Sequence, residues 1–329
     1  TTERMNVAEP PPTFGIWRVR NARPIRSAKT DGAGDATVLL ESLDRRYVHP
    51  GKQLPYAGFG VPHTLELDLG DQPVGKPIVL IMDGWTSFWN STSIAEAARD
   101  GVDFMPVRID VREGDNWRTI VPDMGIPAGK PKTIVTDLTG KMPRGASRIR
   151  LVTNMLVFWD RARVSNDATF VPTTDGMERL PLVSSELRYL GYPKAVSPDG
   201  IEPYTYVYAD CSQKSLWGTL PGYFTRYGDV GQLLSVADDR YVVMNHGDEI
   251  ALEFQAGSNP RPGSETDYFL FLFGYMKEMV ARDSLLSQLE PLPFRGMSYP
   301  YTGVSPVAQD ADYRAYRATY QTRRLGYSN

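Results

Sequence analysis

The chain has 329 residues, a formal net charge of −3 and a single cysteine, Cys211. The small net charge gives no general reason to expect nucleic acid or an anionic membrane surface as a partner. One cysteine excludes an intrachain disulfide, a CxxC redox pair, a haem-attachment motif and a cysteine-rich zinc site, and no apolar run approaches the ~20 residues that span a bilayer.

The N-terminal stretch, residues 1–13, is polar and contains Pro10, Pro11 and Pro12. Consecutive prolines favour an extended conformation, so we expect an N-terminal arm here. The first residue is Thr1, and we expect a signal peptide, a tag or a whole domain to have been removed upstream.

The stretch Gly34–Val48 reads GDATVLLESLDRRYV and recurs as GDVGQLLSVADDRYV at Gly228–Val242, with eight of fifteen positions identical. Each copy begins Gly-Asp, an aspartate can cap a helix, and the leucine pair predicts a short helix feeding a strand. The similarity continues after a gap, with an alternating strand and then an apolar run: Leu65–Leu69 and Ile78–Met82 in one copy, Ile250–Phe254 and Tyr268–Phe273 in the other. An internal duplication of a β-rich unit explains this order.

Residues 14–165 are predicted to form the first unit, made mostly of short strands. The expected strands are Phe14–Arg20, His63–Leu69, Ile78–Trp85, Phe104–Val111, Trp117–Val121, Thr133–Leu138, Arg148–Val152 and Met155–Val164. One helix is expected at Ser93–Arg99, where Ser93 can cap and the alanines favour a helix. Many short strands with few helices are typical of a β-sandwich.

A polar linker, residues 166–179, is predicted to lead into a second β-rich unit at 180–301. Its expected strands are Tyr241–Val243, Glu249–Phe254 and Tyr268–Phe273, and a short helix is expected at Ser284–Leu289. The predicted fold class is therefore mainly β, with two sandwich units of jelly-roll, galactose-binding-like type related by duplication.

The C-terminal arm, residues 302–329, is rich in aromatic and basic side chains. Tyr313, Tyr316 and Tyr320 share one helical face, because residues three and four apart lie side by side on a helix. Together with Arg323 they are expected to dock this arm on its own protein or on a partner.

The motifs HTLELDLG, VLIMDGW, IRLVTNMLVFWDRARV, RYGDVGQLLSVADDRYVVMNHGDEIALEF and EPLPFRGM follow one another in an order that resembles the C-terminal region of bacterial FG-GAP and ASPIC/UnbV (cartilage-acidic-protein-like) repeat proteins. The resemblance implies a periplasmic or extracellular interaction module with no established catalytic residues. This chain lacks the propeller and the calcium loops of that family, so the resemblance does not extend calcium binding to it.

No catalytic motif is present. The three histidines, His49, His63 and His246, have no metal-ligand spacing, and there is no GxSxG elbow, Walker loop or GxGxxG. A hydrolase with a carboxylate pair in a cleft stays open as an alternative. Calcium is possible where Asp68, Asp71 and Asp83 follow or end predicted strands, although aspartate is common in ordinary turns.

The stretch from Asp83 to Thr92 places Trp85, Phe88 and Trp89 beside hydroxyls and the amide of Asn90. Such rings suit sugar stacking or a protein-binding hot spot, but they can also close the end of a core. We therefore expect a non-catalytic, extracytoplasmic interaction or assembly module that is an accessory or structural subunit of a larger complex. The alternative is a carbohydrate-binding module that uses the Trp85–Trp89 loop, with or without support from calcium.

Overall fold

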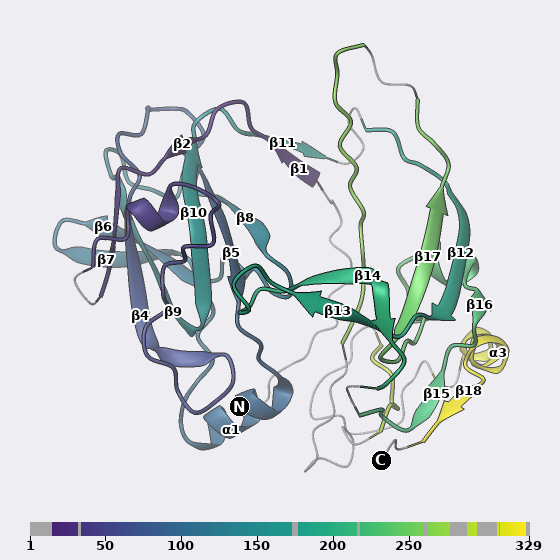
Figure 1. Ribbon diagram of the computed structural model, residues 1–329. Helices are drawn as coiled ribbons and strands as arrows, with labels where there is room; N and C mark the ends of the chain where they lie inside the picture. Colours follow the sequence, from purple (N-terminus) through teal and green to yellow (C-terminus); the bar gives the residue numbers. More distant parts are fainter. Residues whose placement is uncertain are drawn as a thin grey trace. The chain divides into compact units, whose positions relative to one another are not determined.

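The computed structural model describes residues 15–31, 34–172, 177–215, 218–258, 262–276, 288–294, 308 and 310–326. In these residues the protein is mainly β, with antiparallel sheets and few short helices, as the sequence predicts (Figure 1). The chain divides into two compact units. We call residues 15–172 with the loop 197–204 the first unit, and the remaining described residues the second unit. The predicted arm at 1–13 and most of the predicted helix at Ser284–Leu289 lie outside the described residues.

One sheet of the first unit has four antiparallel strands in the order β2-β10-β5-β8. Their bounds are Arg23–Pro24 for β2, Val79–Thr86 for β5, Lys132–Asp137 for β8 and Val157–Ser165 for β10. Every residue of β5 is buried, as expected for an apolar run covered on both faces. At Gly84 a Cβ would lie 2.5 Å from the carbonyl oxygen of Phe158, so this close approach to β10 requires glycine.

The other sheet of the first unit has five antiparallel strands in the order β3-β4-β9-β6-β7. Their bounds are Ser27–Thr30 for β3, Phe59–Asp68 for β4, Arg108–Glu113 for β6, Asn116–Val121 for β7 and Arg148–Met155 for β9. Alternate side chains of a strand point to opposite faces. For this reason Leu65 and Leu67 of β4 are buried while Glu66 between them stays partly exposed.

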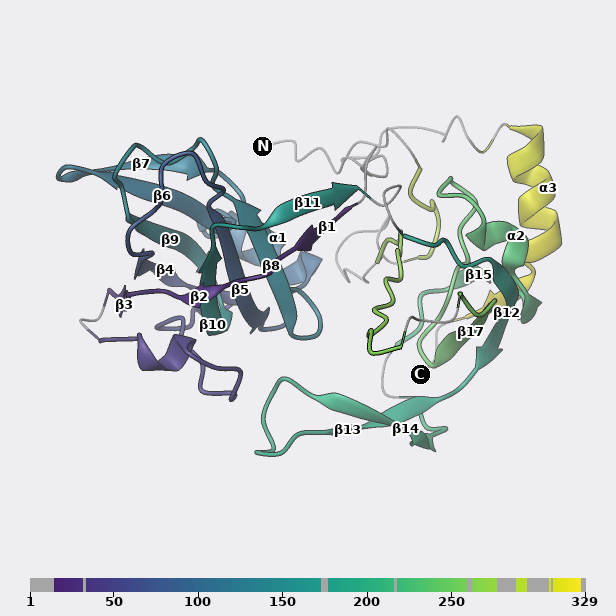
Figure 2. The ribbon, with the colours of Figure 1, turned by 90° about the horizontal axis from the view of Figure 1, so that it is seen from above.

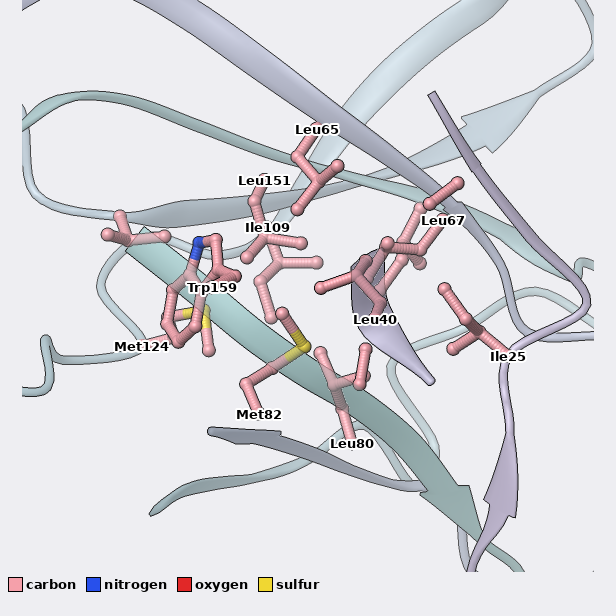
Figure 3. Close-up of a cluster of buried hydrophobic side chains, with 14 of the residues drawn as sticks. Ile25, Leu40, Leu65, Leu67, Leu80, Met82, Ile109, Met124, Leu151 and Trp159 are labelled. Carbon is pink, nitrogen blue, oxygen red and sulfur yellow. The ribbon is translucent and has the colours of Figure 1, made fainter. Parts of the chain in front are cut away.

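A single hydrophobic cluster takes side chains from both sheets of the first unit (Figure 3). Leu67 and Ile109 come from the five-stranded sheet, and Met82 and Trp159 come from the four-stranded one. The 3-10 helix η1 (Val38–Leu40) adds Leu40 to the same cluster. Burying each large apolar side chain contributes about 1.5–3 kcal/mol, so this cluster is the main source of stability in the unit.

The strand β11 (Thr169–Pro172) pairs with β1 (Gly15–Arg18) in a two-stranded ribbon. The linker predicted at 166–179 is therefore wrong over β11, because the pairing partner lies far away in the sequence. The helix α1 (Ser91–Arg99) begins two residues earlier than predicted, and its N-cap is Asn90.

The second unit contains a three-stranded sheet in the order β16-β12-β17 and two ribbons, β13-β14 and β15-β18. The strand bounds are Leu182–Tyr189 for β12, Tyr192–Val196 for β13, Thr205–Ser212 for β14, Gly222–Phe224 for β15, Gly228–Asp229 for β16, Asp248–Phe254 for β17 and Arg323–Leu325 for β18. Its helices are α2 (Gly231–Leu234) and α3 (Ala311–Tyr320), which lie close together in Figure 2. No described helix of the chain is long and apolar enough to cross a membrane.

The second unit has a buried cluster that, among the described residues, consists of Phe224, Val243, Leu289 and Leu292. The strands predicted at Tyr241–Val243 and Tyr268–Phe273 are both wrong, since neither segment pairs in a sheet of the described residues. β17 confirms the strand predicted at Glu249–Phe254.

The two copies of the repeated sequence share one local structure. Asp44 accepts hydrogen bonds from the backbone N and the Nε of Arg46, at 3.0 and 2.7 Å. Asp238 accepts the same two bonds from Arg240, at 2.9 and 2.7 Å. The surroundings differ, because η1 lies against β10 in the four-stranded sheet whereas α2 lies against β12 in the three-stranded one. The internal duplication stays a prediction.

Candidate functional site

Trp85 lies on β5 and is only 7% exposed. Its ring stacks on Phe158 of the neighbouring strand, with centroids 4.4 Å apart and planes 8° apart. Tyr47 meets the Trp85 ring edge-on at 6.0 Å. The flat face that a sugar would need is thus occupied by the protein's own aromatic side chain.

Two further residues of the predicted aromatic site also have structural contacts. Trp89 packs against the first-unit core and lies 5.9 Å from the ring of Phe104. Asn90 accepts a hydrogen bond from the backbone N of Ser93, which fixes its side chain as the N-cap of α1. Of the three aromatic side chains, that of Phe88 is mostly exposed, at 61%. The structure therefore corrects the prediction: these residues do not form one binding platform.

The three candidate calcium ligands are not brought together either. Asp68 and Asp71 both contact the guanidinium of Arg26, at 3.9 and 3.0 Å, so a cation of the protein already lies between them. Asp83 lies on β5, in the other sheet, and pairs with Arg161. Among the described residues no group of three or more His, Cys, Asp or Glu could hold a metal ion.

The C-terminal helix α3 docks on its own chain. Tyr316 is 4% exposed, and its hydroxyl donates to the carbonyl oxygen of Tyr241 at 2.6 Å. Burial raises the pKa of Tyr316 well above its usual range. Tyr320 donates to the side chain of Gln232 in α2, and Tyr313 lies against Tyr316 with ring centroids 5.4 Å apart. These three tyrosines therefore make contacts inside the second unit.

Arg323, on β18, completes this docking through a buried ion pair with Asp248. Their closest atoms lie 2.5 Å apart, and the side chain of Asp248 is 1% exposed. Tyr227 donates to the same carboxylate at 2.9 Å, and its ring faces the Arg323 guanidinium at 4.2 Å. Burial and the Asp248 hydrogen bond raise the pKa of Tyr227 to about 12. Of the two roles left open for the C-terminal arm, these contacts show docking of its described residues on the same chain; a partner surface stays a prediction.

Buried carboxylates of the first unit have structural partners. Asp160 accepts the backbone N–H groups of Asp44 and Arg45 at 3.3 and 3.2 Å, while burial raises its pKa. These bonds hold Arg45 at a φ of 67°, which is uncommon for a residue with a side chain. The Arg45 guanidinium then binds both oxygens of Asp199, at 2.8 and 3.3 Å, and so fixes the loop 197–204.

The stretch 268–276, YFLFLFGYM, is a run of consecutive apolar residues, most of which are exposed. Its exposed side chains are Tyr268 at 75%, Phe269 at 56%, Leu270 at 55%, Phe271 at 45%, Leu272 at 75%, Tyr275 at 40% and Met276 at 72%. In Figure 1 this stretch is drawn without a strand arrow. We call it the apolar segment. Exposed apolar patches of this kind commonly mark interaction sites.

The pattern of the apolar segment is that of a strand buried on both faces. In an extended chain Phe269 and Phe271 would point to one side, and Leu270 and Leu272 to the other. All four are large and apolar, so neither side of the extended segment would be suited to contact with water. The segment carries no charge between Asp267 and Lys277. Phe269, Leu270 and Leu272 are 56%, 55% and 75% exposed, so the described residues cover these three side chains only in part.

No family model, no curated protein and no solved structure matches the chain.

Proposed function

We propose that this chain is a non-catalytic interaction module, an accessory or structural subunit that binds a protein partner through the apolar segment. The exposure of Leu272 and its neighbours carries this proposal. A partner protein can cover both faces of an extended segment, by adding a strand beside it and by packing side chains on it. The partner surface is apolar rather than charged, because nine consecutive residues of the segment carry no charge.

An edge strand of the second unit supports the same proposal. β17 is an edge strand of the three-stranded sheet, and Phe254 at its end is 43% exposed. Edge strands present N–H and C=O groups that pair readily with a strand of another chain. An extended segment of a partner protein can thus bind the backbone of β17 as well as exposed side chains of the second unit.

The proposed site of action is outside the cytoplasm, in the periplasm or on the cell exterior. This part of the proposal is supported by the order of motifs that resembles bacterial FG-GAP and ASPIC/UnbV proteins. Fractionation of the source cells with an antibody to the chain tests it; recovery with the cytoplasmic markers would contradict it.

The interaction itself is tested on the chain purified from its source under native conditions. We expect a stoichiometric complex, and we expect Leu272→Asp to release the chain from it, since a buried unpaired charge is strongly unfavourable. Val74→Asp is the matched control, because Val74 is an isolated apolar residue with 73% exposure, against 75% for Leu272. A wild-type chain that is monomeric, or two variants that behave alike, would exclude the apolar segment as the interface.

A further inference from the structure

The outer face of β10 carries two neighbouring arginines. Arg161 and Arg163 are two residues apart and point to the same side, away from Ala162 and Val164, which are fully buried. The strand register sets Arg161 opposite Asp83 and Arg163 opposite Ile81 of β5. The two guanidinium groups are partly exposed, with 24% and 30% of their side chains open to solvent.

These arginines have more donors than acceptors. Each guanidinium offers five N–H groups. Arg161 donates one hydrogen bond, from Nε to Asp83 at 2.9 Å. Arg163 approaches Asp83 only to 3.8 Å, beyond hydrogen-bond distance, and its buried Nε has no acceptor in the described structure. Asp83 is itself engaged by the hydroxyl of Thr133 at 2.5 Å.

Two arginines face one carboxylate on this side of the sheet. The charges that act on Arg163 are those of Arg161 and Asp83, and burial together with Arg161 lowers its pKa. Asp160, the next carboxylate along β10, lies near enough to Asp83 for their charges to interact, but it accepts hydrogen bonds from backbone N–H groups. A bound carboxylate would supply acceptors to arginine donors that are costly to leave unpaired.

An aromatic pair follows Arg161 along the same face. Trp85 lies two residues after Asp83 on β5, so both point to the same face, and the register sets Trp85 opposite Phe158. The indole N–H of Trp85 is buried without an acceptor, and its ring is stacked on the half-buried Phe158. A second unpaired donor and an apolar surface thus lie on the arginine face, on the Arg161 side of the pair.

We propose that Arg161 and Arg163 form a binding site for the carboxylate of a small aromatic or apolar organic acid. The fork of an arginine matches the two oxygens of a carboxylate. A carboxylate brings one negative charge close to Asp83, and a phosphate dianion would bring two, so the site favours the monoanion. The apolar part of the ligand contacts Phe158. This site lies in the first unit and does not depend on the interaction proposed for the apolar segment.

The test uses the intact chain labelled with nitrogen-15 and sodium benzoate as the probe, at constant ionic strength. We expect saturable shifts of the Arg163 Nε–H and Trp85 indole N–H resonances. Benzamide has the same ring without the charge and should produce no such shifts. Arg163→Gln should weaken benzoate binding at least about tenfold, as loss of a charged hydrogen bond predicts.

Arg118→Gln is the control, because Arg118 is an exposed arginine of the other sheet paired with Glu113. It should leave benzoate binding unchanged. Equal shifts with benzamide, tighter binding of inorganic phosphate, or no saturable shift with benzoate would each overturn the proposal. The ligand comparison needs only the wild-type chain, so it decides even where Arg163→Gln fails to fold.

Discussion

The two units of this chain build stability in different ways. The first unit collects one large cluster of buried side chains from a five-stranded and a four-stranded sheet. Among the described residues, the second unit has a buried cluster of four side chains, and it adds a tyrosine-lined helix and a buried ion pair. It also leaves a run of large apolar side chains in solvent. The first unit thus relies mainly on apolar packing between two sheets, whereas polar contacts have a larger share in the described part of the second unit.

The largest expected effect is the loss of stability when a buried aromatic side chain of the first unit is removed. Phe59 is 0% exposed and meets the rings of Tyr56 and Phe104 edge-on, each at 6.4 Å. Phe59→Ala should lower the free energy of unfolding by about 3–5 kcal/mol, because it removes buried area and leaves a cavity. Urea denaturation of wild type and variant measures this. A loss below about 1 kcal/mol, the average for any substitution, would show that the side chains around Phe59 are not closely packed.

In the second unit the strongest single effect should come from the ion pair. Arg323→Met keeps the apolar stem but leaves the carboxylate of Asp248 buried without its cation. We expect a loss of about 3 kcal/mol, at the lower end for a broken buried pair because 16% of the Arg323 side chain is exposed.

The control for this variant is Arg324→Met. Arg324 is the exposed neighbour on the same strand, with its guanidinium 6.0 Å from the Tyr223 ring. Differential scanning calorimetry should show a lower melting temperature for Arg323→Met only. Equal shifts for both variants would mean that the C-terminal strand is held by its backbone alone.

The sequence predicts much of the first unit because its strands alternate or form short apolar runs. Leu65 and Leu67 flank a glutamate, and that spacing by itself assigns the face of β4. The apolar segment was misassigned for a related reason: Phe269 to Leu272 read as a strand buried on both faces, but a pattern cannot say whether the chain itself covers them.

Two residues of the predicted aromatic site have structural contacts, and the sequence signals only one of these contacts. Asn90 stands three residues before Ser93, the spacing of a helix N-cap and its third residue, and this signal was available in the sequence. The burial of Trp85 could not be predicted from the sequence, because its stacking partner Phe158 is distant in the chain. Arg161 and Arg163 alternate with Ala162 and Val164, and that spacing could have shown two cations on one face of a strand.

The smallest and most specific expected effect is a change in the stability of the first unit at acid pH. Asp110 lies on β6 with its side chain 2% exposed, and Arg150 donates to it at 2.9 Å and Thr119 at 2.8 Å. Burial opposes its charge, yet these hydrogen bonds and the nearby arginines hold the pKa of Asp110 below its ordinary value.

A carboxyl group whose pKa is lowered on folding stabilises the protein above its unfolded pKa of about 4, and this contribution is lost as the pH falls through the folded pKa. Asp110→Asn should therefore cost about 2 kcal/mol at neutral pH, the range of a charged hydrogen bond. The difference from wild type should shrink as the pH falls below about 4. Denaturation curves of both proteins across this range measure the difference. If it stays constant from neutral to acid pH, the carboxylate charge is not what joins β6 to β9, and the first unit owes its stability to apolar packing alone.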